Sequence, residues 1–273
     1  MTVSDQRPLA GGPGLVPAFA AVRGRIALVA LLVTLGALAW WWTAMRMDGM
    51  DNGPWTSLGA LGSFLAIWVV MMAAMMLPSV APTVALYSRL IKTRSPVSPL
   101  VFTCGYLVTW TAAGAAAFAV AAGGVWAGGD VLSWSRAGRW VAGATLLAAA
   151  AYELTPLKEA CLAKCRSPLG FLLGAWRPDR RGAMRMGVAH GAWCVGCCWA
   201  LMAALFALGL MSVVWMAFVA ALIAFEKLVP HRLPATYATA VILLALGVLI
   251  LAAPGSTPAL HIPDNGSMMR MGT

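Results

Sequence analysis

An apolar run over residues 183–208 contains the sequence His190-Gly191-Ala192-Trp193-Cys194-Val195-Gly196-Cys197-Cys198. The run is long enough to cross a membrane as a helix. Helical spacing puts His190, Cys194, Cys197 and Cys198 on one face, with Met202 one turn further along. Lipid offers no partner to a thiolate or a ring nitrogen, so such side chains face a bundle interior. One nitrogen, three thiols and a thioether on one face suit a soft metal ion such as Cu(I).

The alternative for this run is plain packing, because a free cysteine behaves as a small hydrophobic residue. Three thiols within five residues, and a histidine one turn earlier, favour a site. Glycines at 187, 191 and 196 also allow another helix to approach closely.

The composition is that of a polytopic membrane protein. Of 273 residues, 61% are hydrophobic and only 10% are charged, which is more apolar surface than a soluble domain can hide. The fold class predicted is all-α, a transmembrane bundle of about seven spans. The expected spans are 26–45, 58–80, 100–123, 137–154, 183–208, 211–227 and 235–253. The second could continue past Pro78 and Pro82 towards Leu90 as a kinked helix.

The basic residues alternate in density from loop to loop, which predicts the orientation. Of the 19 lysines and arginines, all except Arg46, Arg136, Arg139 and Arg270 fall on one side. The positive-inside rule places that side in the cytoplasm, with the N-terminus in and the C-terminus out. The net charge of +10 is thereby explained by the membrane rather than by nucleic acid. We expect a bacterial-type inner-membrane protein without a cleavable signal peptide.

This topology predicts three parts: a flexible cytoplasmic tail at 1–25, a transmembrane helical domain at 26–253 and a flexible external tail at 254–273. It places no cysteine on the oxidising side, which argues against a disulfide scaffold as the role of the six cysteines. The thiols are instead available for metal binding or redox chemistry.

A second cluster of soft ligands lies in the run 58–80, which contains Met71, Met72, Met75 and Met76. Thioethers bind Cu(I) without deprotonation, although methionine is also a common filler of apolar cores. Given the predicted directions of the two helices, these methionines and the thiols both fall near the middle of the membrane. The kink expected at Pro78 is typical of a helix that lines a cavity.

The loop 155–182 contains a short helix of its own. Thr155 can cap it, with Pro156 at its first position, and Pro168 ends it. Cys161 and Cys165 are then neighbours on one face, where nearby basic residues favour the thiolates. The pair is either a two-thiolate metal or exchange site or part of an interfacial helix that touches lipid headgroups.

Outside the membrane, methionines recur at Met45, Met47 and Met50 and in the tail at 268–271, with His261 nearby. Exposed methionines have no core to fill, which favours capture of a soft ion there. Near the cytoplasmic side, Glu226 and Lys227 are explained by an ion pair or a snorkelling lysine. Glu153 has a similar explanation, or either carboxylate could line an ion exit.

Three sequence blocks together resemble a family of predicted metal-binding integral membrane proteins. They are Trp68 to Pro78, Tyr152 to Cys165, and Gly187 to Met202, supported by Trp215-Met216 and Glu226-Lys227. The resemblance runs from about residue 64 to 230. It implies a multi-helix membrane fold with a metal site, and some relatives are similar to accessory or copper-chaperone proteins.

The leading hypothesis is a Cu(I)-handling membrane protein that transports the ion or delivers it to a partner cuproprotein. The candidate ligands are His190, Cys194, Cys197, Cys198, Met202, Met71, Met72, Met75, Met76, Cys161 and Cys165. Zinc is the alternative ion, since Cys and His also bind it. The expected partners are the lipid bilayer, the metal ion, and a membrane cuproenzyme or soluble metallochaperone. No nucleotide-binding motif is evident, which argues against ATP-driven transport.

Two further hypotheses stay open. The first is an enzyme, a thiol–disulfide oxidoreductase that uses Cys194/Cys197 with Cys161/Cys165 as a relay, because Cys194 to Cys197 has the Cys-x-x-Cys spacing. The second is an assembly subunit of a larger membrane complex, in which the cysteines only pack. A binding or transport role is favoured over an enzyme, because a dithiol relay does not need His190, Cys198 or the methionines.

Overall fold

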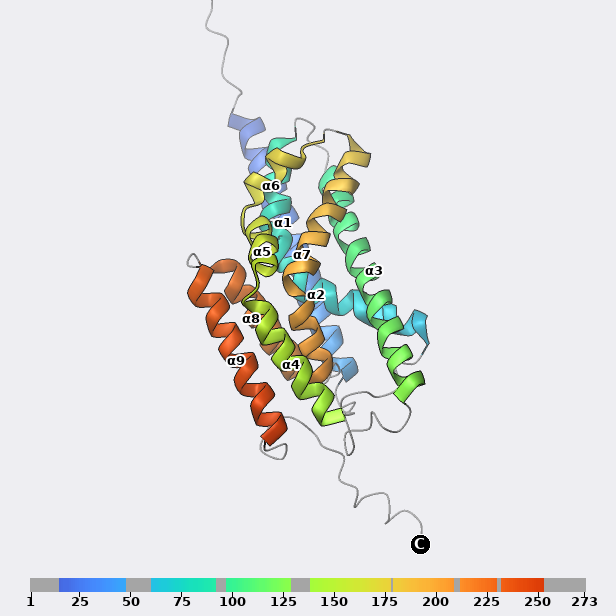
Figure 1. Ribbon diagram of the computed structural model, residues 1–273. Coiled ribbons are helices and arrows are strands. Elements are labelled where there is room, and N and C mark those ends of the chain that lie inside the picture. Colours follow the sequence, from blue (N-terminus) through green and yellow to red (C-terminus); the bar gives the residue numbers. More distant parts are fainter. Residues whose placement is uncertain are drawn as a thin grey trace, which may run out of the picture.

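The chain folds as a bundle of helices, which a computed structural model describes for residues 15–47, 60–91, 97–128, 138–177, 179–208, 212–229 and 232–252 (Figure 1). Within these residues the structure is all-α, as predicted. The helices are α1 (Leu15–Met47), α2 (Leu61–Leu90), α3 (Val97–Gly128), α4 (Arg139–Glu153), α5 (Pro156–Arg166), α6 (Pro168–Ala175), α7 (Arg180–Leu208), α8 (Val213–Leu228) and α9 (Arg232–Ala252).

Five of these helices are long and apolar enough to cross a membrane: Ile26–Arg46, Leu61–Leu90, Val97–Gly124, Arg180–Leu208 and Pro234–Ala252. The prediction of about seven spans is therefore not confirmed. The helices at the two other predicted positions, α4 and α8, have 15 and 16 residues. At 1.5 Å per residue, each is shorter than the roughly 30 Å of hydrocarbon that a span must cross.

Two helix boundaries extend the predicted elements. Helix α2 runs unbroken through Pro78 and Pro82 to Leu90, as the sequence allowed. Helix α1 begins at Leu15, inside the segment predicted as a tail.

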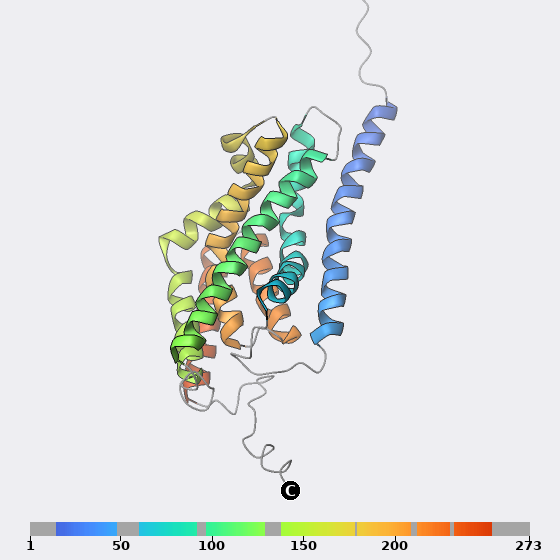
Figure 2. The ribbon, with the colours of Figure 1, turned by 90° about the vertical axis from the view of Figure 1, so that its right-hand side faces the viewer.

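Helix α7 is the centre of the bundle. It packs most extensively against α3, and also against α4, α5 and α8, while α1 lies along α2 and α9 lies along α4 (Figure 2). Helix α2 reaches α7 through aromatic side chains, because Phe206 lies 5.7 Å from Trp68 and 6.5 Å from Phe64 between ring centroids. The Trp68 indole also donates a 2.8 Å hydrogen bond to the Trp110 carbonyl of α3. This network fixes the relative height of α2, α3 and α7.

Glycines bring α3 and α7 into backbone contact. A Cβ atom at Gly187 would lie 2.0 Å from the Phe102 carbonyl oxygen, and one at Gly105 would lie 2.4 Å from the Met184 carbonyl oxygen. Neither position therefore has room for a side chain without a shift of the backbone. The prediction that Gly187 permits close helix approach is confirmed here, in the manner of small-residue packing in membranes.

We predict that Gly187→Ala lowers the stability of the bundle by about 1–3 kcal/mol, the usual cost of overpacking a tight interior. Gly123→Ala on α3 is the control, because a Cβ there meets nothing within 4 Å. The measurement is the midpoint of thermal unfolding in detergent. Equal midpoints for the two variants would contradict the proposed backbone contact.

Helices α4, α5 and α6 follow one another beside α7, with short breaks between them. Helix α4 ends at Glu153. Thr155 caps α5, because its hydroxyl accepts a 3.3 Å hydrogen bond from the Lys158 backbone N–H. Pro156 and Pro168 lie in the first turns of α5 and α6. The predicted bounds of this short helix are confirmed. Helix α5 packs against α7 and α8 rather than standing apart as a surface loop.

Candidate metal centre

Three thiols from two helices meet beside the centre of α7. The sulfur atoms of Cys165 from α5 and of Cys194 and Cys197 from α7 all lie within 4.8 Å of one another. Two sulfurs on opposite sides of one ion, with bonds of roughly 2.3 Å, lie about 4.6 Å apart. The spacing therefore suits a shared soft ion after small side-chain adjustments.

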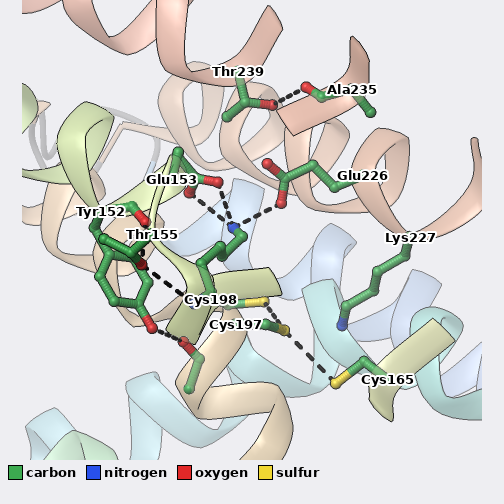
Figure 3. Close-up of polar contacts among 12 residues, drawn as sticks. Tyr152, Glu153, Thr155, Cys165, Cys197, Cys198, Glu226, Lys227, Ala235 and Thr239 are labelled. Carbon is green, nitrogen blue, oxygen red and sulfur yellow. Dashed lines mark hydrogen bonds and ion pairs between the residues drawn. The ribbon is translucent and has the colours of Figure 1, made fainter. Parts of the chain in front are cut away.

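The thiol group continues to a fourth sulfur. Cys197 Sγ lies 3.6 Å from Cys165 Sγ and 3.3 Å from Cys198 Sγ, and Figure 3 shows Cys198, Cys197 and Cys165 in succession. Cys198 is outside the three-thiol group. Cys194, Cys197 and Cys198 are each 1% exposed, whereas Cys165 is partly accessible. An ion that reaches the group from α5 therefore meets Cys165 first.

Polar groups from three other helices surround Cys194. The ammonium of Lys227 on α8 lies 3.2 Å from Cys194 Sγ, and it donates a second hydrogen bond of 3.2 Å to Ser79 Oγ on α2. The Tyr106 hydroxyl of α3 lies 3.1 Å from the same sulfur. A positive charge and a hydroxyl at these distances stabilise negative charge on Cys194, which is the form of cysteine that binds metals.

A buried ion cluster adjoins the thiol group. The Lys158 ammonium of α5 lies 2.8 Å from Glu153 Oε1 of α4 and 2.8 Å from Glu226 Oε2 of α8 (Figure 3). The side chains of Lys158 and Glu153 are fully buried, and that of Glu226 is 2% exposed. Burial by itself would lower the pKa of Lys158, but Glu226 and Glu153 together raise it above its ordinary value. Lys158 is therefore charged at neutral pH.

Glu226 and Lys227 thus have separate partners. The sequence suggested an ion pair or a snorkelling lysine, but Glu226 is bound to Lys158 while Lys227 points to Cys194 and Ser79. Successive positions on a helix diverge by about 100°, so neighbours serve different sites. The end of α8 is held further by a hydrogen bond from the Arg166 guanidinium to the Val229 carbonyl.

Cys161 lies apart from the three-thiol group. It is 5% exposed, and its sulfur lies against Gly196, where an added Cβ would approach it to 2.7 Å. Burial raises the pKa of the Cys161 thiol, and the opposing effect of Lys158 is smaller. Lys158 therefore favours the Cys161 thiolate in the expected direction, but burial outweighs its effect. The helix face that Cys161 and Cys165 share packs on α7, where only Cys165 joins other thiols.

The methionines of α2 lie on a helix that is linked to α7 at two points. Trp68 is level with Phe206, and Ser79 is linked through Lys227 to Cys194. The side chains of Met71, Met72, Met75, Met76 and Met202 are all buried.

His190 lies one turn before Cys194 in an aromatic setting. Its ring centroid is 4.9 Å from Phe171, 5.9 Å from Phe102 and 6.0 Å from Tyr106. It is 4% exposed, and its Nδ1 atom has no hydrogen-bond partner among the described residues. The structure therefore keeps His190 near the thiols but outside the group of three.

The external methionines lie largely outside the described residues. Met45 is 64% exposed, but it lies within α1 and within the candidate span Ile26–Arg46 rather than in an external segment. Met50, His261 and the methionines at 268–271 belong to segments that the structure does not describe.

Comparison with known protein families shows which family the chain matches. The PpoB2 family, described as a copper chaperone, matches residues 65–250. The chain belongs to this copper-chaperone family. The match covers more than half of the chain and all of the residues that build the thiol group and the ion cluster. No curated protein and no solved structure matches the chain.

Sequence reasoning missed three members of the centre. Lys227, Tyr106 and Ser79 come from α8, α3 and α2, and contact Cys194 or each other only through the tertiary fold. A lysine within an apolar run was the available signal for Lys227, because a charge in such a place needs a partner. Tyr106 and Ser79 carry no comparable signal.

We predict that Lys158→Met destabilises the protein by about 3–5 kcal/mol, because it leaves two buried carboxylates without their cation. Glu153→Gln leaves one lysine paired with one carboxylate and should cost much less. Unfolding in denaturant, followed by circular dichroism, measures both. A Lys158→Met variant as stable as Glu153→Gln would contradict the role of Lys158 in holding α4, α5 and α8 together.

Proposed function

We propose that this membrane protein holds Cu(I) as its cargo at Cys165, Cys194 and Cys197, for transport or for delivery to a partner cuproprotein. The observation that carries the proposal is the meeting of these three thiols within 4.8 Å. Thiolates select soft ions, and membership of a copper-chaperone family supports copper over zinc. Lys227 offsets part of the negative charge that the thiolates bring into the bundle.

The buried methionines extend the proposed route. Met72, Met75, Met76 and Met202 are all buried, and Met202 follows Cys198 by one turn along α7 towards Leu208. Met71 lies in the same part of α2. Thioethers hold Cu(I) more weakly than thiolates do, and they bring no charge that must be balanced in an apolar interior. We propose that they pass the ion between the external side and the thiols.

On the opposite side, Cys165 and His190 are the proposed exchange positions. Cys165 is the accessible thiol, and the unpartnered Nδ1 of His190 offers a neutral nitrogen one turn from Cys194. Cys198 supplies a further sulfur next to Cys197, and Cys161 serves the packing of α5 on α7. A soluble metallochaperone or a membrane cuproenzyme is the proposed recipient or donor.

The setting we propose is a bacterial-type inner membrane with the N-terminus in the cytoplasm. The positive-inside rule supports this orientation, because Arg180, Arg181 and Arg185 gather at the start of α7. The thiols then open towards the cytoplasm and the methionines towards the outside.

We predict that the purified protein, loaded with Cu(I) under anaerobic conditions, retains roughly one copper ion per chain at its thiolate site. The Cys165→Ser/Cys194→Ser/Cys197→Ser variant should retain none there, and single variants should lose affinity by degrees. Cys104→Ser is the control, since Cys104 is an exposed cysteine on α3. Elemental analysis of the detergent-solubilised proteins measures the copper. Copper retained equally by the triple variant and the control would overturn the site.

One contact favours a second candidate function, a thiol–disulfide relay. Cys165 and Cys197 lie 3.6 Å apart across α5 and α7, so a disulfide needs only a small approach of the two sulfurs. Oxidation would release two protons and two electrons to an acceptor such as a quinone.

Disulfide mapping by mass spectrometry separates the two functions. The relay requires a Cys165–Cys197 or Cys194–Cys197 disulfide in protein purified without reductant, and complete loss of function in either single serine variant. The copper proposal predicts free thiols that become protected from alkylation when Cu(I) is added. A stable disulfide, together with no bound copper, would replace the copper proposal with the relay.

A further inference from the structure

Four charged side chains, two acidic and two basic, lie beside the thiol group. Glu153 and Glu226 share the ammonium of Lys158, while the ammonium of Lys227 faces Cys194. With neutral thiols the four charges sum to zero. The excess negative charge therefore lies on the carboxylates, and the excess positive charge lies at the thiols.

Loading of the thiols disturbs this balance. A Cu(I) ion held by two of the three sulfurs as thiolates, with the third remaining a neutral thiol, carries one net negative charge, so the cluster as a whole becomes negative. An uncompensated charge away from water is costly, and buried groups usually neutralise instead. The carboxylates of Glu153 and Glu226 can receive a proton, because they are two acids around one base.

The geometry of the two carboxyl groups fits such a proton. Both side chains are at most 2% exposed, and both carboxylates contact the same Lys158 ammonium, at 2.7 Å for Glu153 and 2.8 Å for Glu226. Glu226 Oε1 has no hydrogen-bond partner among the described residues, and Glu153 Oε2 has only its ionic contact with Lys158. A shared proton would supply a hydrogen bond between the two groups and remove the excess charge.

We propose that Glu153 and Glu226 form a proton-binding site that balances the charge of the loaded thiol site. The proposal rests on metal binding at the thiols. As the ion binds, two S–H bonds break, and each sulfur keeps its electron pair and bonds the metal. One of the two protons is taken up as an O–H bond of the carboxyl pair, and the other is released to solvent. The reverse transfer accompanies release of the ion, so no net charge is left inside the bundle.

The fold links the two sites through two helices. Helix α5 carries Lys158 and Cys165, and helix α8 carries Glu226 and Lys227, so each helix contributes to both sites. The other titratable groups around the pair are Tyr152 of α4, Cys161 of α5 and Cys198 of α7. The Tyr152 hydroxyl donates to the Gly196 carbonyl, Cys161 packs on Gly196, and Cys198 contacts Cys197, so none of them donates to either carboxylate.

Infrared spectroscopy tests the proposal, because a protonated carboxyl group has a carbonyl stretch that a carboxylate lacks. The probe is Ag(I), a soft monovalent ion that is stable to oxidation, added to the full-length protein at neutral pH. The bound metal is counted in the same sample. Glu153→Gln and Glu226→Gln are the test variants, since each keeps Lys158 paired with one carboxylate. Glu159→Gln is the control, on an exposed position of α5.

We expect the loaded wild type and Glu159→Gln to show the protonated-carboxyl band, and both test variants to lack it. The proton site alone would be overturned if the wild type bound Ag(I) without showing the band. It would also be overturned if both test variants bound Ag(I) and kept an unchanged band. Absence of bound Ag(I) from the wild type would instead overturn the metal site, and the proton site with it.

Discussion

The ion cluster around Lys158 is the constraint on which the thiol site depends. One buried ammonium holds the last residue of α4, the first turn of α5 and the last turn of α8 at a single point. Because α5 is short and leaves this point directly, its far end is carried along α7 and Cys165 arrives beside Cys197. A buried ion pair is weak evidence for stability. Here its effect is geometric, since it fixes where a thiol from one helix meets thiols from another.

Helix α7 supplies the other two thiols of the site, and its two sides face different helices. Towards α3 it presents glycines, and the backbones touch at Gly187. Towards α5 and α8 it presents Cys194 and Cys197. The tight contact with α3 also places Tyr106 against Cys194. Rigid packing on one side thus positions the chemistry on the other, which suits a site that must accept and release an ion without changing the fold.

The sequence predicts the local features well, because they depend on neighbours along the chain. The cap at Thr155, the prolines that start α5 and α6, and the cysteine face of α7 follow from helix geometry alone. The tertiary partner of each side chain does not follow from helix geometry. Cys161 and Cys165 share a helix face, yet only Cys165 reaches the thiols, because α5 folds back on α7. Likewise Glu226 and Lys227 are adjacent in sequence but serve two sites. Hydropathy predicts about seven spans, whereas five helices among the described residues are long enough to cross, because hydropathy registers that α4 and α8 are apolar but not that they are short.

X-ray absorption at the copper edge tests the central claim most directly, because it reports the atoms bound to the ion. For protein loaded with Cu(I), we expect a first shell of two or three sulfur atoms at thiolate distances, which is lost when Cys165, Cys194 and Cys197 are changed to serine. The spectrum of Cys104→Ser should match that of the wild type. A shell dominated by nitrogen or oxygen, or a sulfur shell that survives the triple change, would contradict the account.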